Sequence, residues 1–281
     1  MIHYFAGCKI AAERLSENMI TTSNLIYFSP TKTTKKVLEA ICIGFGAKVT
    51  NHFDLTFPIP ANFSMQVIDE GLAIFGIPVY SGRVPAVAAT RMRSLKSAGI
   101  PAILVAVYGN REYEDALVEL RDLVIQLGFI PFAAASFIGE HSYSTHEKPL
   151  AQNRPDAKDL ELAKSFGAKI GEILKNKSPL KDLQNLPGNI PYKALTSKLP
   201  VSPITIEDKC DKCGICVSVC PTEAIEINIL TETDNTACLL CCACVKECPT
   251  GARINDSEFI KSISQRLFDN CSVRKEPEMF F

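Results

Sequence analysis

The sequence lacks a long hydrophobic run, a large net charge and a dinucleotide-binding fingerprint. Its longest apolar stretch, residues 100–107, is far shorter than the roughly 20 residues that a membrane-spanning helix needs. No basic start followed by a sustained apolar segment opens the chain. The formal net charge is -1 over 281 residues, which gives no support to nucleic-acid binding. Gly44 and Gly46 follow a predicted helix rather than a strand, and a third glycine is missing. We therefore expect neither membrane insertion nor a nucleic-acid partner.

Cysteine, in contrast, is abundant, and eight of the twelve cysteines fall in two runs of the form C-x2-C-x2-C-x3-C followed by proline. Each cysteine of the second run follows its counterpart in the first at one constant offset, so the unit is an internal duplication. This spacing is typical of bacterial proteins that bind two [4Fe-4S] clusters. A pair of zinc sites is the alternative, but such sites usually show two pairs of ligands separated by a longer spacer. The first run comprises Cys210, Cys213, Cys216 and Cys220, and the second comprises Cys238, Cys241, Cys244 and Cys248.

The short intervals also predict how the cysteines are shared between the clusters. Three thiolates of one loop reach three corners of a small cluster, and in two-cluster proteins the fourth cysteine of each run binds the other cluster. We therefore expect Cys248 to complete the first cluster and Cys220 to complete the second. Cys242, beside the predicted ligand Cys241, is expected to be a spectator thiol. A chain with this many thiols to keep reduced fits the cytoplasm, and oxygen-poor conditions are a further expectation.

Charge is unevenly distributed along the chain. Residues 205–256 carry nine acidic and four basic side chains, a net charge of -5, so the remainder of the chain carries +4. This asymmetry predicts an acidic docking face for a basic redox partner. An ordinary solvated surface is the alternative.

Residues 24–175 alternate short apolar runs with longer amphipathic ones, which is typical of parallel strands joined by helices. We predict an α/β domain with a doubly wound, five-stranded parallel sheet. The predicted strands are residues 24–28, 47–53, 71–77, 100–108 and 130–138, and the predicted helices are residues 33–43, 85–95, 112–127 and 156–174.

The flanking segments differ in character. Residues 1–23 do not fit the alternation and form a predicted N-terminal extension, in which Met19 is a second candidate for the translation start. Residues 176–203 contain five prolines and are predicted to be a linker before a small α+β cluster domain at residues 204–256. Residues 257–271 fit an amphipathic helix. The last three residues, Met279, Phe280 and Phe281, are expected to dock on the protein, because large apolar groups are unfavourable in water.

Three loops that follow predicted strands suggest a second cofactor. Ligands of doubly wound sheets bind outside the carboxyl ends of the strands. The first loop opens a helix and is rich in hydroxyl groups, which favours a bound phosphate. The other two combine an aromatic residue with a glycine and a cation, and would suit a flat conjugated ring. An N-cap and ordinary tyrosine packing are the alternatives. The loops are Ser29, Pro30, Thr31, Lys32, Thr33 and Thr34; Pro78, Val79, Tyr80, Ser81, Gly82 and Arg83; and Tyr108, Gly109, Asn110 and Arg111.

These loops resemble those of flavodoxin, and with the two cysteine runs the chain resembles the bacterial flavodoxin-ferredoxin fusion family. The resemblance implies an FMN cofactor whose phosphate contacts Ser29, Thr31, Thr33 and Thr34. It further implies that Tyr80 and Tyr108 lie near the isoalloxazine ring and that Gly109 and Asn110 offer backbone contacts. The chain departs from the family at Lys32, where flavodoxins commonly have glycine. A lysine there crowds the phosphate or pairs with it.

Two histidines fall in the loop after the last predicted strand. His141 and His146 are near enough in sequence to approach the flavin edge, and a group that titrates near neutrality can deliver a proton to a reduced flavin. Surface histidines without a partner are the alternative.

Electron transfer between FMN and two [4Fe-4S] clusters, and on to a redox partner protein, is the predicted function. One alternative is a flavin-dependent reductase of a small molecule such as a quinone, supplied with electrons by the clusters. Another is a flavodoxin-like domain that serves only as an empty docking module. The sequence assigns neither the electron donor and acceptor nor the oligomeric state.

Overall fold

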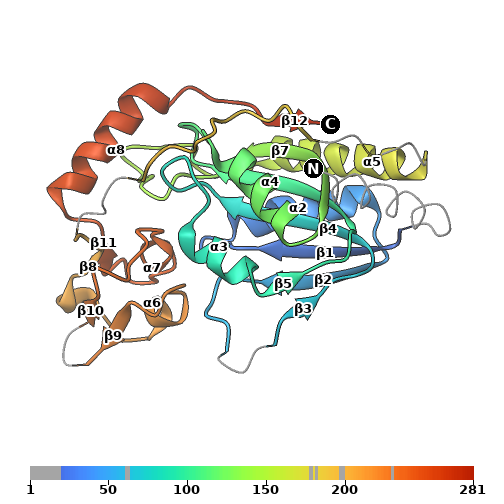
Figure 1. The fold of residues 1–281 in the computed structure, drawn as a ribbon. Coiled ribbons are helices and arrows are strands. Elements are labelled where there is room, and N and C mark those ends of the chain that lie inside the picture. Colours follow the sequence, from blue (N-terminus) through green and yellow to red (C-terminus); the bar gives the residue numbers. More distant parts are fainter. Residues whose placement is uncertain (1–19, 61–63, 177–179, 181–182, 196–199, 229–230) are drawn as a thin grey trace.

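The computed structural model describes residues 20–60, 64–176, 180, 183–195, 200–228 and 231–281, and a six-stranded sheet is its central element (Figure 1). The strand order is β12-β7-β6-β4-β1-β2. Five of these strands, all but β12, are parallel, and their order is that of a flavodoxin-like doubly wound sheet. The strands are β1 (Thr22–Tyr27), β2 (Val49–Asp54), β4 (Leu72–Pro78), β6 (Pro101–Tyr108), β7 (Ile130–Ile138) and β12 (Glu278–Phe280).

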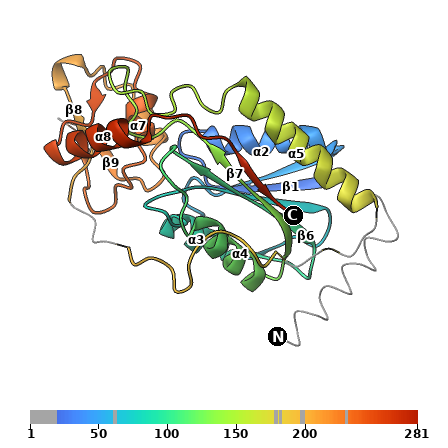
Figure 2. The same ribbon diagram turned by 90° about the horizontal axis from the view of Figure 1, so that it is seen from above.

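Two helices cover each face of this sheet (Figure 2). Helices α2 (Thr33–Phe45) and α5 (Ala157–Lys175) pack on one face, and α3 (Ala86–Met92) and α4 (Ala116–Gln126) on the other. On α5, Ala163, Phe166 and Ile170 recur at helical spacing and are buried in the core, as expected of an amphipathic helix. None of the helices in the described ranges is long and apolar enough to cross a bilayer.

The predicted elements differ from the structure mainly at their ends. The strand at residues 130–138 is confirmed in full as β7, and the limits of the other four predicted strands differ from the structure by at most two residues. The predicted helix at residues 85–95 is wrong at its C-terminal end. Helix α3 stops at Met92, and β5 (Leu95–Lys96) instead pairs with β3 (Gln66–Val67). Local periodicity does not reveal this pairing because β4 and α3 separate the two strands along the chain. The sheet begins at Thr22, inside the predicted extension, and residues 1–19 lie outside the described ranges.

The chain end adds a sixth strand that the sequence pattern did not predict. β12 pairs antiparallel with β7, with Phe280 opposite Ala134. Met279 and Phe280 pack against the two cores on opposite faces of the sheet. The predicted docking of the apolar tail is therefore confirmed, and its backbone also covers the edge of β7.

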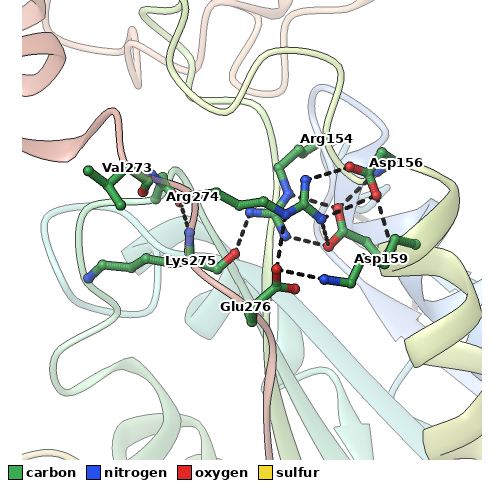
Figure 3. A network of polar contacts seen from close by, with 9 residues as sticks. Arg154, Asp156, Asp159, Val273, Arg274, Lys275 and Glu276 are labelled. Carbon is green, nitrogen blue, oxygen red and sulfur yellow. Dashed lines mark hydrogen bonds and ion pairs between the residues drawn. The ribbon is translucent and has the colours of Figure 1, made fainter.

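Ion pairs hold the C-terminal strap, which we define as residues 272–281, against the start of α5 (Figure 3). Arg154 donates from Nε to Asp159 Oδ2 over 2.8 Å, and from Nη1 to the carbonyl of Lys275 over 2.7 Å. Arg274 donates to Asp156 Oδ2 over 2.6 Å. Asp156 and Asp159 also form the capping box of α5. The strap is therefore tied to a helix N-terminus as well as to a strand.

A small module of residues 204–256, here called the cysteine module, lies beside the sheet (Figure 1). It contains two short helices and two two-stranded sheets. One of these sheets pairs β8, which precedes the first cysteine run, with β11, which follows the second. The two halves of the duplication are thus interlocked by backbone pairing. The elements are β8 (Ile204–Thr205), the 3-10 helix η1 (Glu207–Lys209), α6 (Ile215–Ser218), β9 (Ile225–Ile227), β10 (Thr231–Thr233), α7 (Ala243–Lys246) and β11 (Arg253–Ile254). Helix α8 (Glu258–Cys271) then leads back to the strap.

The described part of the proline-rich connection packs against the larger domain. Leu183 and Leu186 are buried members of the core on the α3 and α4 side of the sheet. The Asp115 carboxylate at the start of α4 accepts hydrogen bonds from the backbone N–H groups of Asn189, over 2.8 Å, and Lys193, over 2.6 Å. Residues 184–192 therefore lie along α4.

Candidate cluster and flavin sites

Four cysteines of the two runs, together with Cys242, line one cavity that is partly open to solvent. Cys238, Cys241 and Cys244 come from the second run, and Cys220 comes from the first. This is the set that the sequence assigned to the second cluster. Among the described residues, no three side chains of histidine, cysteine, aspartate or glutamate converge closely enough for a single metal ion. The thiols surround a space instead, and the four that belong to the runs suit an iron-sulfur cluster in number and type.

Three cysteines of the first run are also neighbours. Burial raises the pKa of Cys216, Arg253 opposes this effect, and the charges of Cys210 and Cys213 add to it. Cys248, the fourth predicted ligand of this set, is not among the residues that line the cavity of the second run. Although burial opposes it, hydrogen bonds from nearby backbone N–H groups and from Thr250 lower the pKa of Cys248. A lowered pKa favours the thiolate that iron requires.

The duplication in sequence is reproduced in the backbone. Helices α6 and α7 begin at equivalent places of the two cysteine runs and have the same length. Gly214 and Cys242 precede these helices at equivalent places, and both adopt left-handed backbone angles. That conformation favours glycine, so Cys242 occupies a position where a side chain is strained. Two further equivalent pairs share the left-handed conformation, namely Lys212 with Leu240 and Glu223 with Gly251.

Burial disfavours thiolates in this cavity unless positive charge or hydrogen-bond donors compensate them. Burial raises the pKa of Cys241 well above that of a free cysteine, so a thiolate there needs compensation. Backbone donors provide part of this compensation. Ala224 N–H donates to Cys220 Sγ over 3.3 Å, and Leu240 N–H donates to Cys238 Sγ over 3.4 Å. Bound iron supplies the remaining positive charge in sites of this type.

Cys242 differs from its neighbours. Its Sγ donates to the carbonyl of Leu240 over 3.4 Å and accepts from Nδ2 of Asn255 over 3.1 Å. Burial raises the pKa of Cys242 to about 12, which keeps this thiol protonated. These partners suit the predicted spectator role.

The cavity of the second run lies against the carboxyl end of the large sheet. Lys32 Nζ pairs with Glu247 over 2.8 Å, and Lys246 Nζ pairs with Glu140 over 2.5 Å. Arg91 of α3 donates to the carbonyl of Pro221 over 2.7 Å. Leu239, between two predicted ligands, packs against the core of the larger domain. Three polar contacts and one apolar contact thus join the module to the edge where flavodoxin-like folds bind ligands.

The predicted phosphate loop, residues 29–34, lies at this edge and opens α2. Lys32 has a left-handed backbone conformation with φ of 64°, which explains why glycine is usual at this place. Its ammonium group binds Glu247 of the cysteine module. Ser29 Oγ accepts from the backbone N–H of Lys35 over 3.1 Å, as an N-terminal cap does. Thr31 and Thr33 bring their hydroxyl oxygens within 3.4 Å of each other.

Thr34 provides the test of whether a phosphate fits this loop. The residue is completely buried, and its Oγ1 has no hydrogen-bond partner. The first-turn N–H groups of a helix also have no intrahelical acceptor. An unpaired hydroxyl beside such donors suits an anion with several oxygens, so the loop fits a phosphate group.

Tyr80 is on the second predicted loop and faces the cysteine module. Its backbone exchanges two hydrogen bonds with Arg83, over 3.1 and 3.0 Å, which closes a turn around Ser81 and Gly82. Burial raises the pKa of Tyr80, and the nearby charges of Cys241 and other thiols add to the effect. Arg83 turns its guanidinium to Glu119, in a two-pronged ion pair at 2.7 and 2.9 Å. Pro78, the last residue of β4, precedes the turn.

The side chains of the third predicted loop contact the core and the strap. Tyr108 is only 4% exposed, and its ring packs edge-to-face on Tyr113 with centroids 5.3 Å apart. Asn110 donates to the carbonyls of Cys271 and Val273 over 2.6 and 2.8 Å. What these residues offer to a ligand at the sheet edge is therefore their backbone.

His141 occupies the space beside Gly109. A Cβ atom on that glycine would lie 2.3 Å from His141 Cδ2, so the two residues are in close contact. Burial lowers the pKa of His141 to about 4, and the cations Lys246 and Arg111 contribute. The imidazole is therefore neutral at physiological pH. His146 is exposed.

Several residues of the site were not predicted. Tyr143 lies near the thiols of the second run, which with burial raise its pKa. Thr56 Oγ1 accepts from the backbone N–H of Ser29 over 2.9 Å and so supports the phosphate loop. Arg253 is buried between the two cysteine sets. Only Arg253 has a signal in the sequence, since its equivalent in the first half, Ile225, is apolar.

Known proteins are similar to two parts of this chain. Residues 203–226 match the family described as "4Fe-4S binding domain". A flavodoxin from the domain Archaea is 14% identical, with a TM-score of 0.36 over 55% of this chain and 99% of that protein. A short-chain flavodoxin associated with a PDU bacterial microcompartment is 16% identical, with a TM-score of 0.38 over 57% of this chain and all of that protein.

A rubredoxin oxygen:oxidoreductase of Desulfovibrio gigas gives 14% identity and a TM-score of 0.36 over 58% of this chain and 38% of that protein. No curated protein sequence matches the chain. The strand order and the 4Fe-4S match together confirm the predicted fold class. The chain joins a flavodoxin-like α/β domain to a 4Fe-4S binding domain, as in the flavodoxin-ferredoxin fusion family that its sequence resembles.

Proposed function

We propose that this protein passes single electrons between FMN and two [4Fe-4S] clusters, and on to a redox partner protein. One observation carries the proposal. The cavity ringed by Cys220, Cys238, Cys241 and Cys244 belongs to a module that is bound to the sheet edge at the phosphate loop, through Lys32 and Glu247. Two redox groups held at such an edge would be close enough to exchange electrons without a diffusing carrier.

The burial of the cysteines supports an order for the route. Cys241, in the set nearer the sheet, is buried, whereas Cys213 of the first run is exposed. The second set would therefore exchange electrons with FMN, and the first would exchange them with the partner. Asp208 and Asp211, which flank Cys210, are exposed and would provide part of an acidic docking face. The direction of flow is set by the potentials of the partners.

The chain's own residues would bind and shield the flavin. The N-terminus of α2, with Ser29 and Thr34, would bind the phosphate, while Tyr80 and Tyr143 would exclude water near the ring. FMN, when bound, supplies chemistry that accepts or donates one or two electrons. The protein's part is distance, orientation and electrostatics.

The flavin site is tested by FMN binding to the full chain purified without oxygen. Thr34→Val removes the unpaired hydroxyl with little change in shape, and we expect FMN to bind about tenfold more weakly, since one hydrogen bond to a charged group is lost. Thr33→Glu adds a negative charge beside the phosphate and should prevent retention. Thr90→Val, at an exposed place on α3, is the matched control and should bind as the wild type does. Equal FMN affinity in the Thr34 and Thr90 variants would remove the proposed phosphate site.

A reductase function gives a different result in the same preparation. Steady-state turnover of a quinone that disappears when only the flavin is removed would favour the enzyme over the carrier. Iron and sulfide without any bound flavin would instead favour the empty docking module.

A further inference from the structure

Arg253 is a buried cation between the two cysteine sets. It is the first residue of β11 and is 2% exposed. Its Nη2 lies 3.7 Å from Sγ of Cys244, in the second set, and its charge also acts on Cys216, in the first. A single side chain thus lies beside a predicted ligand of one cluster and acts electrostatically on a predicted ligand of the other.

The guanidinium has no carboxylate partner among the described residues. It donates to Thr205 Oγ1 and Thr233 Oγ1, both over 2.8 Å, and these acceptors are neutral. Its Nε is buried without any partner. A buried charge without a counter-ion is strongly unfavourable, so the fold needs an anion at this place.

The duplication shows that this position does not require an arginine for packing. Ile225, the equivalent residue of the first half, lies on β9 and is 4% exposed in an apolar cluster with Cys216 and Cys244. One half of the module therefore has an aliphatic side chain where the other has a cation. The anions that this cation faces are the cysteine sulfurs and whatever cluster they hold.

We infer that Arg253 is a positioning residue that raises the reduction potentials of both [4Fe-4S] clusters, and that of the second set more. The inference depends on the clusters of the proposed function. Reduction adds one electron, supplied by the flavin or the partner, and so makes the cluster more negative by one charge. A fixed positive charge stabilises the reduced state relative to the oxidised one. Burial keeps solvent ions from screening the interaction.

The test varies the charge at position 253 in the intact holoprotein. Arg253→Gln removes the charge, Arg253→Lys keeps it, and Arg253→Ile installs the residue of the other half. Midpoint potentials are measured by anaerobic redox titration followed by electron paramagnetic resonance. We expect the neutral variants to lower the equilibrium constant for reduction of the second-set cluster about tenfold. For one electron, this lowers the midpoint potential of that cluster by about 59 mV. Arg253→Lys should stay near the wild type.

Lys209→Met is the matched control, because Lys209 is an exposed cation beside Cys210 in the same module. Its shift should be small and should vanish at high salt, whereas the shift of the Arg253 variants should persist. Equal midpoints in Arg253→Lys and Arg253→Gln, both with wild-type iron content, would overturn the inference.

Loss of clusters also decides the question. If the neutral variants lose iron while Arg253→Lys retains it, the positive charge is required and the inference stands. If Arg253→Lys loses iron as well, the role is one of shape and the inference fails. A wild-type protein without any iron-sulfur absorption would instead refute the proposed function itself.

Discussion

Arg154 should contribute more to stability than any exposed cation of the strap network. Its side chain and that of Asp159 are 4% and 0% exposed, and they form a buried ion pair at the start of α5. Arg154→Met leaves the carboxylate of Asp159 buried without its main partner and removes the hydrogen bond to the carbonyl of Lys275. Breaking a buried pair by removing one partner costs about 3–5 kcal/mol. For a domain of this size, that loss corresponds to a decrease in Tm of roughly 10 °C.

Thermal unfolding followed by circular dichroism measures this effect. Lys158→Met is the matched control, since Lys158 belongs to the same network, pairs with Glu276 over 2.8 Å and has a side chain that is 64% exposed. An exposed pair of this kind contributes less than about 1 kcal/mol. The double variant Arg154→Met with Asp159→Asn should recover part of the loss, because no unpaired charge remains. A Tm for Arg154→Met within about 2 °C of the control would refute the reasoning.

Three further predictions concern the second cysteine set, the interface and the strap. Cys220→Ser should reduce bound iron from about eight to about four atoms per chain, since the first run then lacks the ligand for the second cluster; unchanged iron by colorimetric assay would contradict this. Lys246→Glu should weaken the contact with Glu140 by about 1 kcal/mol, and adding Glu140→Lys should restore stability to urea. A double variant that is no more stable than Lys246→Glu would show that the pair does not form. The Arg274 guanidinium and the backbone N–H of Asp159 hold the pKa of Asp156 below its usual range, so their stabilisation is present above about pH 4 and is lost as pH falls. The stability difference between Arg274→Met and wild type should therefore narrow from about pH 5 to about pH 2 in urea unfolding, and a constant difference would exclude this linkage.

Local sequence patterns were sufficient to predict the elements that are stabilised by residues nearby in the chain. The apolar run of β7 has a glycine near each end, and its predicted limits match the structure. The stripe on α5 follows the helical period and is buried where expected. The cysteine spacing assigned Cys220, Cys238, Cys241 and Cys244 to one cluster, and the structure places these four residues, with Cys242, around one cavity.

Local sequence patterns did not predict the contacts between residues far apart in the chain. The pairing of β12 with β7 joins residues far apart in the chain, and the sequence of residues 278–280 does not indicate which strand they pair with. Lys32 was expected at the phosphate, yet its ammonium group binds Glu247, which lies in the other domain and far along the chain. Asn110 was expected to offer backbone contacts, and its side chain proves to bind the strap. In each case the outcome depends on how the cysteine module and the chain end return to the sheet.

Quantification of iron, sulfide and FMN in the full chain, purified without oxygen, tests the central claim most directly. The account predicts about eight iron atoms, about eight sulfides and one FMN per chain. Zinc without sulfide, or half of this iron in a protein whose eight cysteines are intact, would contradict the presence of two clusters.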